Sequence, residues 1–278
     1  MFLVVGGDLR QIYTAKKLSE VDTVEILGFN NNISIPNVVK NWSNNKADVI
    51  ILPLPVTLDG IEVNAKFSNE SIALSSLPTM LKENGVIFGG KVTGLEKIFR
   101  KTKIIDYFDR EELSVLNAVP TAEGAIQIAM ENTAETLFGQ NILITGFGRI
   151  AKVLSKILVS MGAKVSISAR KCSDLAWAEI FGCIPIKQES FAKEIGKFNL
   201  IFNTVPACIF TENILKKVDS NTLIIDLASK PGGVDFTIAQ TIGIKVIWAL
   251  SLPGKVAPIT SGEIIANTIL NIIDEIKC

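Results

Sequence analysis

A glycine-rich turn between an apolar run and a helix-like segment constrains this chain more than any other feature. The strand-like run Asn141–Thr145 leads into Gly146-x-Gly148-x-x-Ala151, and Gly162 stops the helix-like segment that follows. A strand, a tight turn and a helix in this order are what the dinucleotide-binding fingerprint requires. The turn therefore predicts a Rossmann-like sheet with phosphates bound at a helix N-terminus.

The small residues of this turn each have a physical role. Gly146 allows an unrestricted φ, Gly148 lets backbone amides approach a pyrophosphate, and Ala151 lets the helix pack close to the strand. We expect the cofactor to lie against the turn itself, which comprises Gly146, Phe147, Gly148, Arg149 and Ile150.

The strand after the fingerprint, Lys164–Ser168, is followed by basic residues at the place where an NAD-binding site usually has an acidic residue. Such a site usually has Asp or Glu about 20 residues beyond the glycines, bound to the ribose 2′-hydroxyl. Here that place holds Ser168, Arg170 and Lys171, and no carboxylate precedes Asp174. Two cations and a hydroxyl suit a 2′-phosphate. The pattern predicts NADP rather than NAD, the alternative being that both cations are solvated surface residues.

Chain length and charge set further limits. At 278 residues the chain has reached the size at which single cores stop growing, so we expect two domains. Its 28 Lys and Arg balance 28 Asp and Glu, which favours neither nucleic acid nor an anionic membrane as a partner. No run reaches the about 18 apolar residues of a membrane span. Met1 leads directly into a strand, which argues against a signal peptide, and we expect a cytoplasmic protein.

The chain contains no histidine. This excludes an imidazole metal ligand and the histidine acid–base chemistry of many hydroxyacid dehydrogenases. Any proton must move through a carboxylate, Lys, Tyr, Cys, water or the substrate. We expect reduced thiols and no metal site, because no Cys-x-x-Cys pair occurs among the cysteines, which are Cys172, Cys183, Cys208 and Cys278.

Strand-like and helix-like segments alternate along the chain. Before the fingerprint we expect a helix near Arg10–Leu18 and strands at Phe2–Val5, Thr23–Leu27, Asp48–Leu52, Gly85–Phe88 and Lys103–Asp106. After it we expect strands at Lys164–Ser168, Ile184–Ile186, Leu200–Asn203, Leu223–Asp226 and Lys245–Trp248. The alternation predicts an α/β fold of two Rossmann-like, doubly wound parallel-sheet domains with helices on both faces.

Two helices are expected to link the domains. Ala118–Pro120 looks like a hinge, after which Thr121 caps a helix to about Thr136 with Glu123 in its first turn. Ser261 caps a second helix whose broad isoleucine stripe predicts packing. We place a substrate-side domain at 1–118, an NADP domain at 119–260, and the helix 261–278 back against the first domain.

Ligands of open parallel sheets bind outside the carboxyl ends of the strands. Polar or irregular loops follow three strands of the second domain. We expect the nicotinamide half to contact these loops, at Asn203, Thr204, Val205, Pro206, Leu227, Ala228, Pro253 and Gly254.

Five stretches, in this order, resemble one family. They are Gly6-Gly7-Asp8-x-Arg10-Gln11, Ile51-Leu52-Pro53, Val119-Pro120-Thr121-x-Glu123-Gly124, Asp226-Leu227-Ala228-Ser229-x-Pro231-Gly232-Gly233 and Leu252-Pro253-Gly254-x-Val256-Ala257-Pro258. The set spans nearly the whole chain and resembles the dipicolinate synthase A subunit of spore-forming bacteria. Lys230, where some relatives are expected to have Arg, and the variable stretch Gly89–Lys91 leave the carboxylate clamp open.

The resemblance implies a protein that acts with a flavoprotein-like B subunit in the mother cell during sporulation. It implies oxidation and dehydration of 4-hydroxy-tetrahydrodipicolinate, on a branch of the lysine pathway, to pyridine-2,6-dicarboxylate with NADP as acceptor. We also expect a homo-oligomer. Two other functions remain open, namely a non-catalytic protein that binds the dinucleotide or senses redox state, and an NADP-dependent dehydrogenase of another small cyclic imine or amino acid.

A flat diacid calls for cations, hydroxyls and helix N-termini. The candidate substrate-binding residues are Asp8, Arg10, Pro53, Gly90, Lys91, Thr121, Ser229 and Lys255. For catalysis we expect Glu123 to accept a proton and Asp226 to orient the nicotinamide or Lys230. Each has a structural alternative: a first-turn carboxylate for Glu123, a loop hydrogen bond for Asp226, turn formation for Asp8 and a surface position for Arg10.

Overall fold

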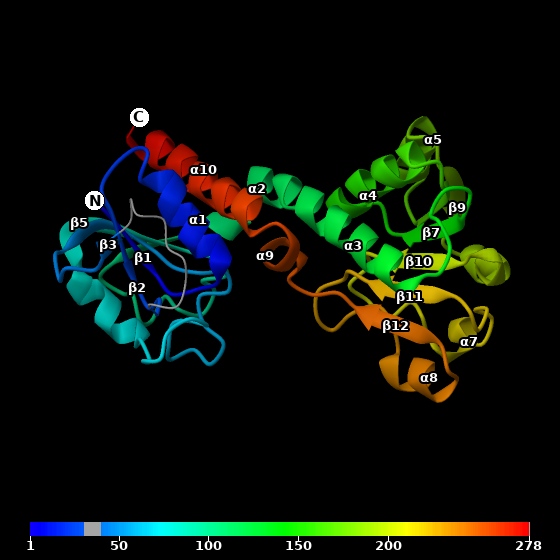
Figure 1. Ribbon diagram of the computed structural model, residues 1–278, viewed down its shortest axis with the longest axis horizontal. Coiled ribbons are helices and arrows are strands. Elements are labelled where there is room, and N and C mark those ends of the chain that lie inside the picture. Colours follow the sequence, from blue (N-terminus) through cyan, green and yellow to red (C-terminus); the bar gives the residue numbers. More distant parts are fainter. Residues whose placement is uncertain (31–39, 278) are drawn as a thin grey trace. The chain divides into compact units, whose positions relative to one another are not determined.

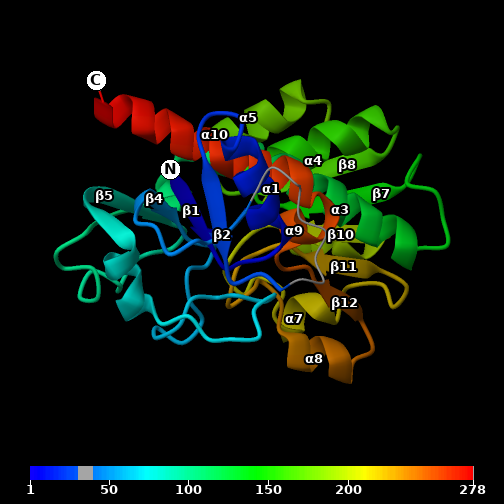
Figure 2. The same cartoon turned by 60° about the vertical axis from the view of Figure 1, so that its left-hand side comes forward.

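The structure is a computed structural model that describes residues 1–30 and 40–277. It divides into two compact units, unit 1 with Met1–Asn117 and Ala257–Cys278, and unit 2 with Ala118–Val256. The chain passes between them after Asn117 and after Val256. Figures 1 and 2 show each unit as a twisted sheet with helices packed against it.

Unit 1 is built on a six-stranded sheet in which every pairing is parallel, in the order β3-β2-β1-β4-β5-β6. Its strands are β1 (Phe2–Val5), β2 (Val24–Leu27), β3 (Lys40–Asn41), β4 (Ala47–Ile51), β5 (Leu81–Gly89) and β6 (Lys103–Asp106). Its helices are α1 (Leu9–Leu18), α2 (Glu111–Leu116), α10 (Pro258–Lys277) and the 3₁₀ helices η1 (Leu74–Met80) and η2 (Tyr107–Asp109).

Unit 2 contains a second six-stranded parallel sheet, in the order β12-β11-β10-β7-β8-β9. Its strands are β7 (Asn141–Thr145), β8 (Lys164–Ala169), β9 (Ile184–Lys187), β10 (Leu200–Asn203), β11 (Leu223–Asp226) and β12 (Lys245–Trp248). Its helices are α3 (Ala118–Asn132), α4 (Arg149–Ser160), α5 (Cys172–Ile180), α6 (Phe191–Glu194), η3 (Ile195–Lys197), α7 (Glu212–Leu215), α8 (Phe236–Thr241) and α9 (Leu252–Val256).

Both sheets have the same strand order relative to the sequence, and the predicted fold class is confirmed. In each unit the first strand lies between the second and the fourth, so the order reverses between β1 and β4 and between β7 and β10. Such reversal points are where open α/β sheets bind ligands. The fingerprint turn follows β7, and Gly6–Gly7–Asp8 follows β1, so both motifs lie at a reversal point.

In the described part of unit 1 the two faces of the sheet are covered differently, by α-helices on one face and by a 3₁₀ helix with irregular segments on the other. One face packs against α1 and α10, whereas the other packs against η1 and irregular segments through Val63, Leu77 and Phe99. Residues 52–80 supply most of this second layer, with Leu95 and Phe99 added from the segment before β6, and their three prolines disfavour a regular α-helix. In unit 2, α3 and α4 cover one face and α6, α7 and α8 the other.

The C-terminal helix α10 lies against α1. The hydroxyl of Thr14 donates to the carbonyl of Gly262 at 3.0 Å, and the stripe residues Ile265 and Ile269 are buried. The helix begins at Pro258 rather than at the predicted cap Ser261, because proline fits a first helical turn without its missing N–H being needed. None of the helices in the described ranges is long and apolar enough to cross a membrane.

Helix α3 also starts earlier than predicted. It runs from Ala118, so Pro120 lies in the first turn and Thr121 is not its cap. Glu123 is the sixth helical residue and is therefore not in the first turn. The helix ends at Asn132, four residues before the predicted Thr136.

Candidate functional site

The turn after β7 has the local geometry that the fingerprint predicts. Gly146 has φ +85°, and a Cβ added there would lie 2.6 Å from Thr204 Oγ1. Gly148 is the N-cap of α4, which has no side-chain cap, and an added Cβ at Gly148 would meet nothing within 4 Å. Ala151 is fully buried against the sheet. The helix N-terminus thus opens onto free space, as a pyrophosphate site requires.

A cavity of about 130 Å³ adjoins this turn at the carboxyl ends of β7 and β8. We call it the β8 cavity. It is lined by Thr145, Gly146, Phe147, Ser168, Ala169, Arg170, Lys171, Asp174, Gln188, Val205 and Ile209. The structure therefore brings together the fingerprint glycine and all three residues predicted to bind a 2′-phosphate.

The charges of the β8 cavity are mixed. Ser168 is buried, whereas Arg170 and Lys171 are exposed. Asp174, in the first turn of α5, adds one carboxylate that the sequence interpretation did not assign to the site. Gln188 was also missed, although it directly follows β9, the strand that pairs with β8. The hydrogen-bond donors of the cavity suit a phosphate, and the Asp174 carboxylate is the one lining group that would repel it.

A buried hydrogen-bond network joins the ends of β7, β10 and β11. Thr145 Oγ1 donates to Asn203 Oδ1 at 2.6 Å, and Asn203 Nδ2 donates to Asp226 Oδ1 at 2.7 Å. Asp226 also accepts the backbone N–H groups of Ala228 and Gly233 at 3.0 and 2.8 Å. Its side chain is fully buried. These contacts favour the structural alternative, in which Asp226 holds the loop from 226 to 233.

The candidate site residues on this loop differ in burial. Leu227 and Ala228 are buried, and Trp248 Nε1 donates to the Ala228 carbonyl at 2.9 Å. Ser229 and Lys230 are exposed at the loop tip. On the neighbouring loop, Asn203 is buried, Thr204 and Val205 are partly buried and Pro206 is exposed.

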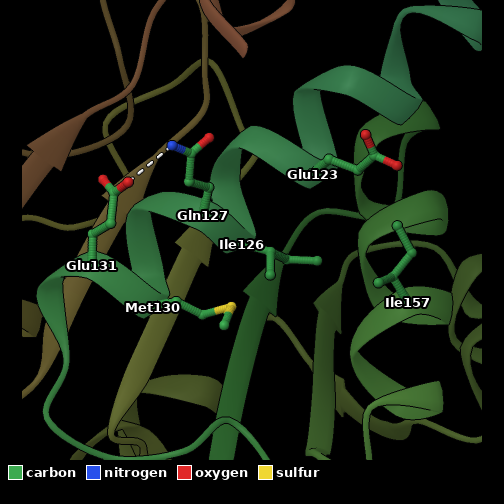
Figure 3. A pocket seen from close by; sticks show the side chains of 6 residues that line it. All are labelled: Glu123, Ile126, Gln127, Met130, Glu131 and Ile157. Atoms are coloured by element: carbon green, nitrogen blue, oxygen red, sulfur yellow. Dashed lines mark hydrogen bonds between the residues drawn. The ribbon is translucent and has the colours of Figure 1, made fainter. Parts of the chain in front are cut away.

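Glu123 does not line the β8 cavity. It is exposed on α3 and lines a separate hollow of about 470 Å³ between α3 and α4 (Figure 3). Its neighbour Gly124 faces α9, where an added Cβ would lie 3.2 Å from Leu252 Cβ and 3.1 Å from Val256 Cγ2. Two of the stretches that resemble the family thus meet in this helix contact. Within α9, Pro253 and Gly254 are partly buried and Lys255 is exposed, and none of the three lines the β8 cavity.

In unit 1, Asp8 and Arg10 form an ion pair at the end of β1. Asp8 caps α1 by accepting the backbone N–H of Arg10 at 3.0 Å, and its carboxylate also accepts two bonds from the guanidinium. Arg10 Nη2 further donates to the Leu54 carbonyl at 3.0 Å. Within the described ranges, Nη1 of Arg10 has no hydrogen-bond partner. This fixed guanidinium retains donors for an anion.

The other predicted substrate residues of unit 1 lie nearby. Gly90 N donates to the Pro53 carbonyl at 3.2 Å, and an added Cβ at Gly90 would lie 2.8 Å from Leu54 Cβ. Lys91 has φ +61°, a conformation that non-glycine residues rarely adopt, and its backbone N–H donates to Asp106 at 3.1 Å. The carbonyl of Leu54 and the carboxylate of Asp106 are contacts that sequence patterns do not reveal.

Free cysteines and possible metal-ligand clusters were also compared with these sites. Cys172, Cys183 and Cys208 are free thiols, and Cys278 lies outside the described residues. In the part of the chain that the structure describes, no group of three or more acidic or cysteine side chains could hold a metal ion.

Comparisons with known proteins identify one family, over residues 1–108 by its family model and over nearly the whole chain by individual relatives. Residues 1–108 match the family model described as the N-terminal domain of the dipicolinate synthase A subunit. The curated dipicolinate synthase A subunit of Bacillus subtilis is 33% identical over 284 residues, covering 99% of this chain and 96% of that protein. A crystal structure of the dipicolinate synthase A subunit from Bacillus halodurans has a TM-score of 0.89 at 33% identity, covering 98% of this chain and 97% of that one.

A more distant structure shares only the fold. The transhydrogenase of Sinorhizobium meliloti has a TM-score of 0.72 at 14% identity, covering 99% of this chain and 94% of that one.

Proposed function

This chain belongs to the family of dipicolinate synthase A subunits, and on that premise we propose that it catalyses the NADP-dependent formation of dipicolinate. The substrate is 4-hydroxy-tetrahydrodipicolinate, which loses one water, one hydride and one proton to become pyridine-2,6-dicarboxylate. We propose that the chain acts with a B subunit, because its relatives are named as one of the subunits of a synthase. The proposed location, the cytoplasm of a sporulating mother cell, follows from the family resemblance alone.

The observation that carries this proposal is the β8 cavity beside the fingerprint turn. The open space at Gly148 and the uncapped start of α4 fit a pyrophosphate, and Ser168, Arg170 and Lys171 fit a ribose 2′-phosphate. Bound NADP⁺ supplies the hydride acceptor. The protein's own residues bind and orient the reactants, which suffices where aromatisation of the ring drives the reaction.

Each unit, taken by itself, offers residues that we propose as candidates for contact with the reactants. In unit 2, the loops held by Asn203 and Asp226 present Thr204 and the exposed Lys230. In unit 1, Arg10 offers Nη1 to a substrate carboxylate, and Lys91 lies on a neighbouring strand-end loop. Glu123 stays a hypothesis for proton transfer, and its location in the α3–α4 hollow gives that hypothesis no support.

Cofactor binding tests the first part of the proposal. Calorimetric titration should show NADP⁺ binding at least tenfold more tightly than NAD⁺. Arg170→Asp should remove this preference, because the phosphate loses a charged donor and meets a carboxylate. Arg100→Asp, at an exposed arginine of unit 1, is the matched control and should preserve it. An unchanged preference in Arg170→Asp would discard the 2′-phosphate site.

Product formation tests the second part. Ultraviolet absorbance of pyridine-2,6-dicarboxylate, followed with freshly generated substrate and NADP⁺, should rise when this chain is combined with its B subunit. Arg10→Lys should reduce the rate, since an ammonium cannot reproduce a fixed guanidinium fork. Equal product formation by the B subunit without this chain would show that this chain is not needed for catalysis, as the non-catalytic alternative requires.

A further inference from the structure

Lys91, on the loop after β5, has a backbone conformation that its residue type disfavours. Its φ is +61°, in the left-handed region where glycine is the usual residue. The two residues before it are already glycines, Gly89 and Gly90, so the chain has a lysine where a third glycine would be free of strain. A strained non-glycine residue of this kind points to a function of its side chain.

The carboxylate of Asp106 fixes this loop from the end of β6. Asp106 Oδ1 accepts the backbone N–H of Lys91 at 3.1 Å, and Oδ2 accepts that of Val92 at 2.9 Å. Oδ1 also accepts the backbone N–H of Phe108 at 2.8 Å. Lys91 Nζ lies 5.4 Å from the centroid of the Phe108 ring. One carboxylate therefore holds both the backbone of Lys91 and the aromatic residue against which its ammonium group lies.

Printed contacts connect this loop to the buried Arg10. Arg10 Nη2 donates to the Leu54 carbonyl at 3.0 Å, and a Cβ added at Gly90, the residue before Lys91, would lie 2.8 Å from Leu54 Cβ. In the part of the chain that the structure describes, neither Arg10 Nη1 nor Lys91 Nζ has a hydrogen-bond partner. Unit 1 thus has two cations with free donors at the carboxyl end of its sheet, where such sheets bind ligands.

We propose that Asp106 is a positioning residue, which holds Lys91 so that its ammonium binds one carboxylate of the diacid while Arg10 binds the other. This inference rests on the proposed function, which supplies the diacid. Two cations on separate loops match two carboxylates on one flat ring, whereas a monoacid engages Arg10 alone. Lys91 therefore sets the preference of the site for a diacid over a monoacid, because the second ion pair forms only with the diacid.

Calorimetric titration of the full chain, with NADP⁺ present, compares pyridine-2,6-dicarboxylate with pyridine-2-carboxylate. Lys91→Gly should weaken binding of the diacid about tenfold or more and binding of the monoacid less than about threefold. The variant should melt at or above the wild-type temperature, because glycine adopts the positive φ without strain. Asn44→Gly is the matched control, since Asn44 has φ +63° before β4, and it should keep both affinities.

Asp106→Asn tests the positioning role, because the amide keeps one acceptor oxygen and replaces the other with a donor. It should weaken binding of the diacid about threefold in the wild-type chain. In Lys91→Gly the same change should add no further loss, because the group that Asp106 positions is then absent. A purely structural role of Asp106 would lower the affinity equally in both chains.

Lys66 is the other cation near the Asp8–Arg10 pair, since it follows Ala65, which forms a parallel bridge with Gly7. It is exposed, and no contact in the described ranges fixes its ammonium group. Lys66→Gln should therefore leave the preference for the diacid unchanged.

Three results would overturn the inference while the wild type still binds the diacid, so that the proposed function stands. Lys91→Gly could keep the wild-type preference, Lys66→Gln could remove it instead, or Asp106→Asn could weaken diacid binding equally in both chains. If the wild type binds neither acid, the proposed substrate site of unit 1 fails together with this inference.

Discussion

Asp8 holds the guanidinium of Arg10 at two points, with Nε and Nη2 each donating at 2.9 Å to a different carboxylate oxygen. Only 18% of the Asp8 side chain and 11% of the Arg10 side chain are exposed. Burial alone would raise the pKa of Asp8, but the hydrogen bonds and charge of Arg10 outweigh it and hold the pKa below its ordinary value of 3.8. Asp8 is therefore a positioning residue for Arg10 as well as a helix cap.

Removing this carboxylate should cost stability in a pH-dependent way. A carboxylate with a lowered folded-state pKa stabilises fully above its unfolded-state pKa, and the contribution is lost as pH falls through the folded value. Asp8→Asn should lower the free energy of unfolding by about 1–3 kcal/mol at pH 7. The difference from wild type should shrink at pH 3, which urea unfolding at both pH values measures. A difference of equal size at pH 3 would contradict the ion-pair account, and the exposed Asp109→Asn serves as control.

The main effect of replacing the buried Asp226 should be a loss of fold stability, not the direct loss of a catalytic group. Its oxygens accept three hydrogen bonds, from Asn203, Ala228 and Gly233. Asp226→Asn places an NH₂ group against one of these donors and should lower the free energy of unfolding by about 2–4 kcal/mol. Asp219→Asn, which alters an exposed turn, should cost less than about 1 kcal/mol. If Asp226→Asn has the melting temperature of the wild type but loses turnover, the result would instead support a direct catalytic role for Asp226.

Asp174 should oppose the 2′-phosphate. It lines the β8 cavity together with Arg170 and Lys171, so its carboxylate repels a bound phosphate. Asp174→Asn should tighten NADP⁺ binding about two- to fivefold in a calorimetric titration. Glu179→Gln, on the exposed side of α5, should change nothing. Weaker NAD⁺ binding with unchanged NADP⁺ binding would instead make Asp174 the acceptor of a ribose 2′-hydroxyl.

The sequence predicted those parts of the fold that depend on local pattern. Short apolar runs separated by turns identified most of the strands, since a buried parallel strand needs an apolar side chain at nearly every position. The helix starts at Ala118 and Pro258 were missed because proline breaks a helix interior but fits a first turn. The absence of an α-helix from residues 52–80, where the structure has irregular chain and the 3₁₀ helix η1, could not be predicted, since the packing of this segment depends on contacts distant in sequence.

Sequence patterns located the candidate site better than the roles of its members. Ser168, Arg170 and Lys171 line one cavity because consecutive residues at a strand end stay together. From the sequence, Asp8 was expected to bind substrate and Asp226 to act in catalysis. Only the hydrogen bonds that they accept show that they hold other residues in place. Gln188 was missed because the fingerprint directs attention to the end of β8, although the pairing of the next strand, β9, with β8 could have placed Gln188 beside it.

The contact between α1 and α10 should depend on the absence of a side chain at Gly262. An added Cβ would lie 2.5 Å from the Arg10 carbonyl oxygen and 2.9 Å from Thr14 N, and both are backbone atoms. Gly262→Ala should therefore lower the free energy of unfolding by about 1–3 kcal/mol, despite the better helix propensity of alanine. Urea unfolding measures this loss. An unchanged or raised stability would show that the two helices can separate without cost.

Replacing the two glycines of the fingerprint turn by alanine should have different effects, a loss of NADP⁺ affinity at Gly148 and a loss of stability at Gly146. At Gly148, φ is −80° and the added Cβ meets nothing, so Gly148→Ala should change stability by less than about 1 kcal/mol. The methyl group would nevertheless occupy the space before the start of α4, so NADP⁺ affinity should fall at least tenfold. Thermal melting and calorimetric titration of the same sample separate the two effects.

At Gly146, φ is +85° and an added Cβ would lie 2.6 Å from Thr204 Oγ1, so Gly146→Ala should destabilise the fold by about 1–3 kcal/mol. Gly139→Ala isolates the backbone part of this loss, because Gly139 has φ +78° and open space around an added Cβ. The excess loss at Gly146 then reports the close approach of the turn to Thr204. If Gly148→Ala binds NADP⁺ as tightly as wild type, the pyrophosphate does not lie at this helix start, and the proposed cofactor site is wrong.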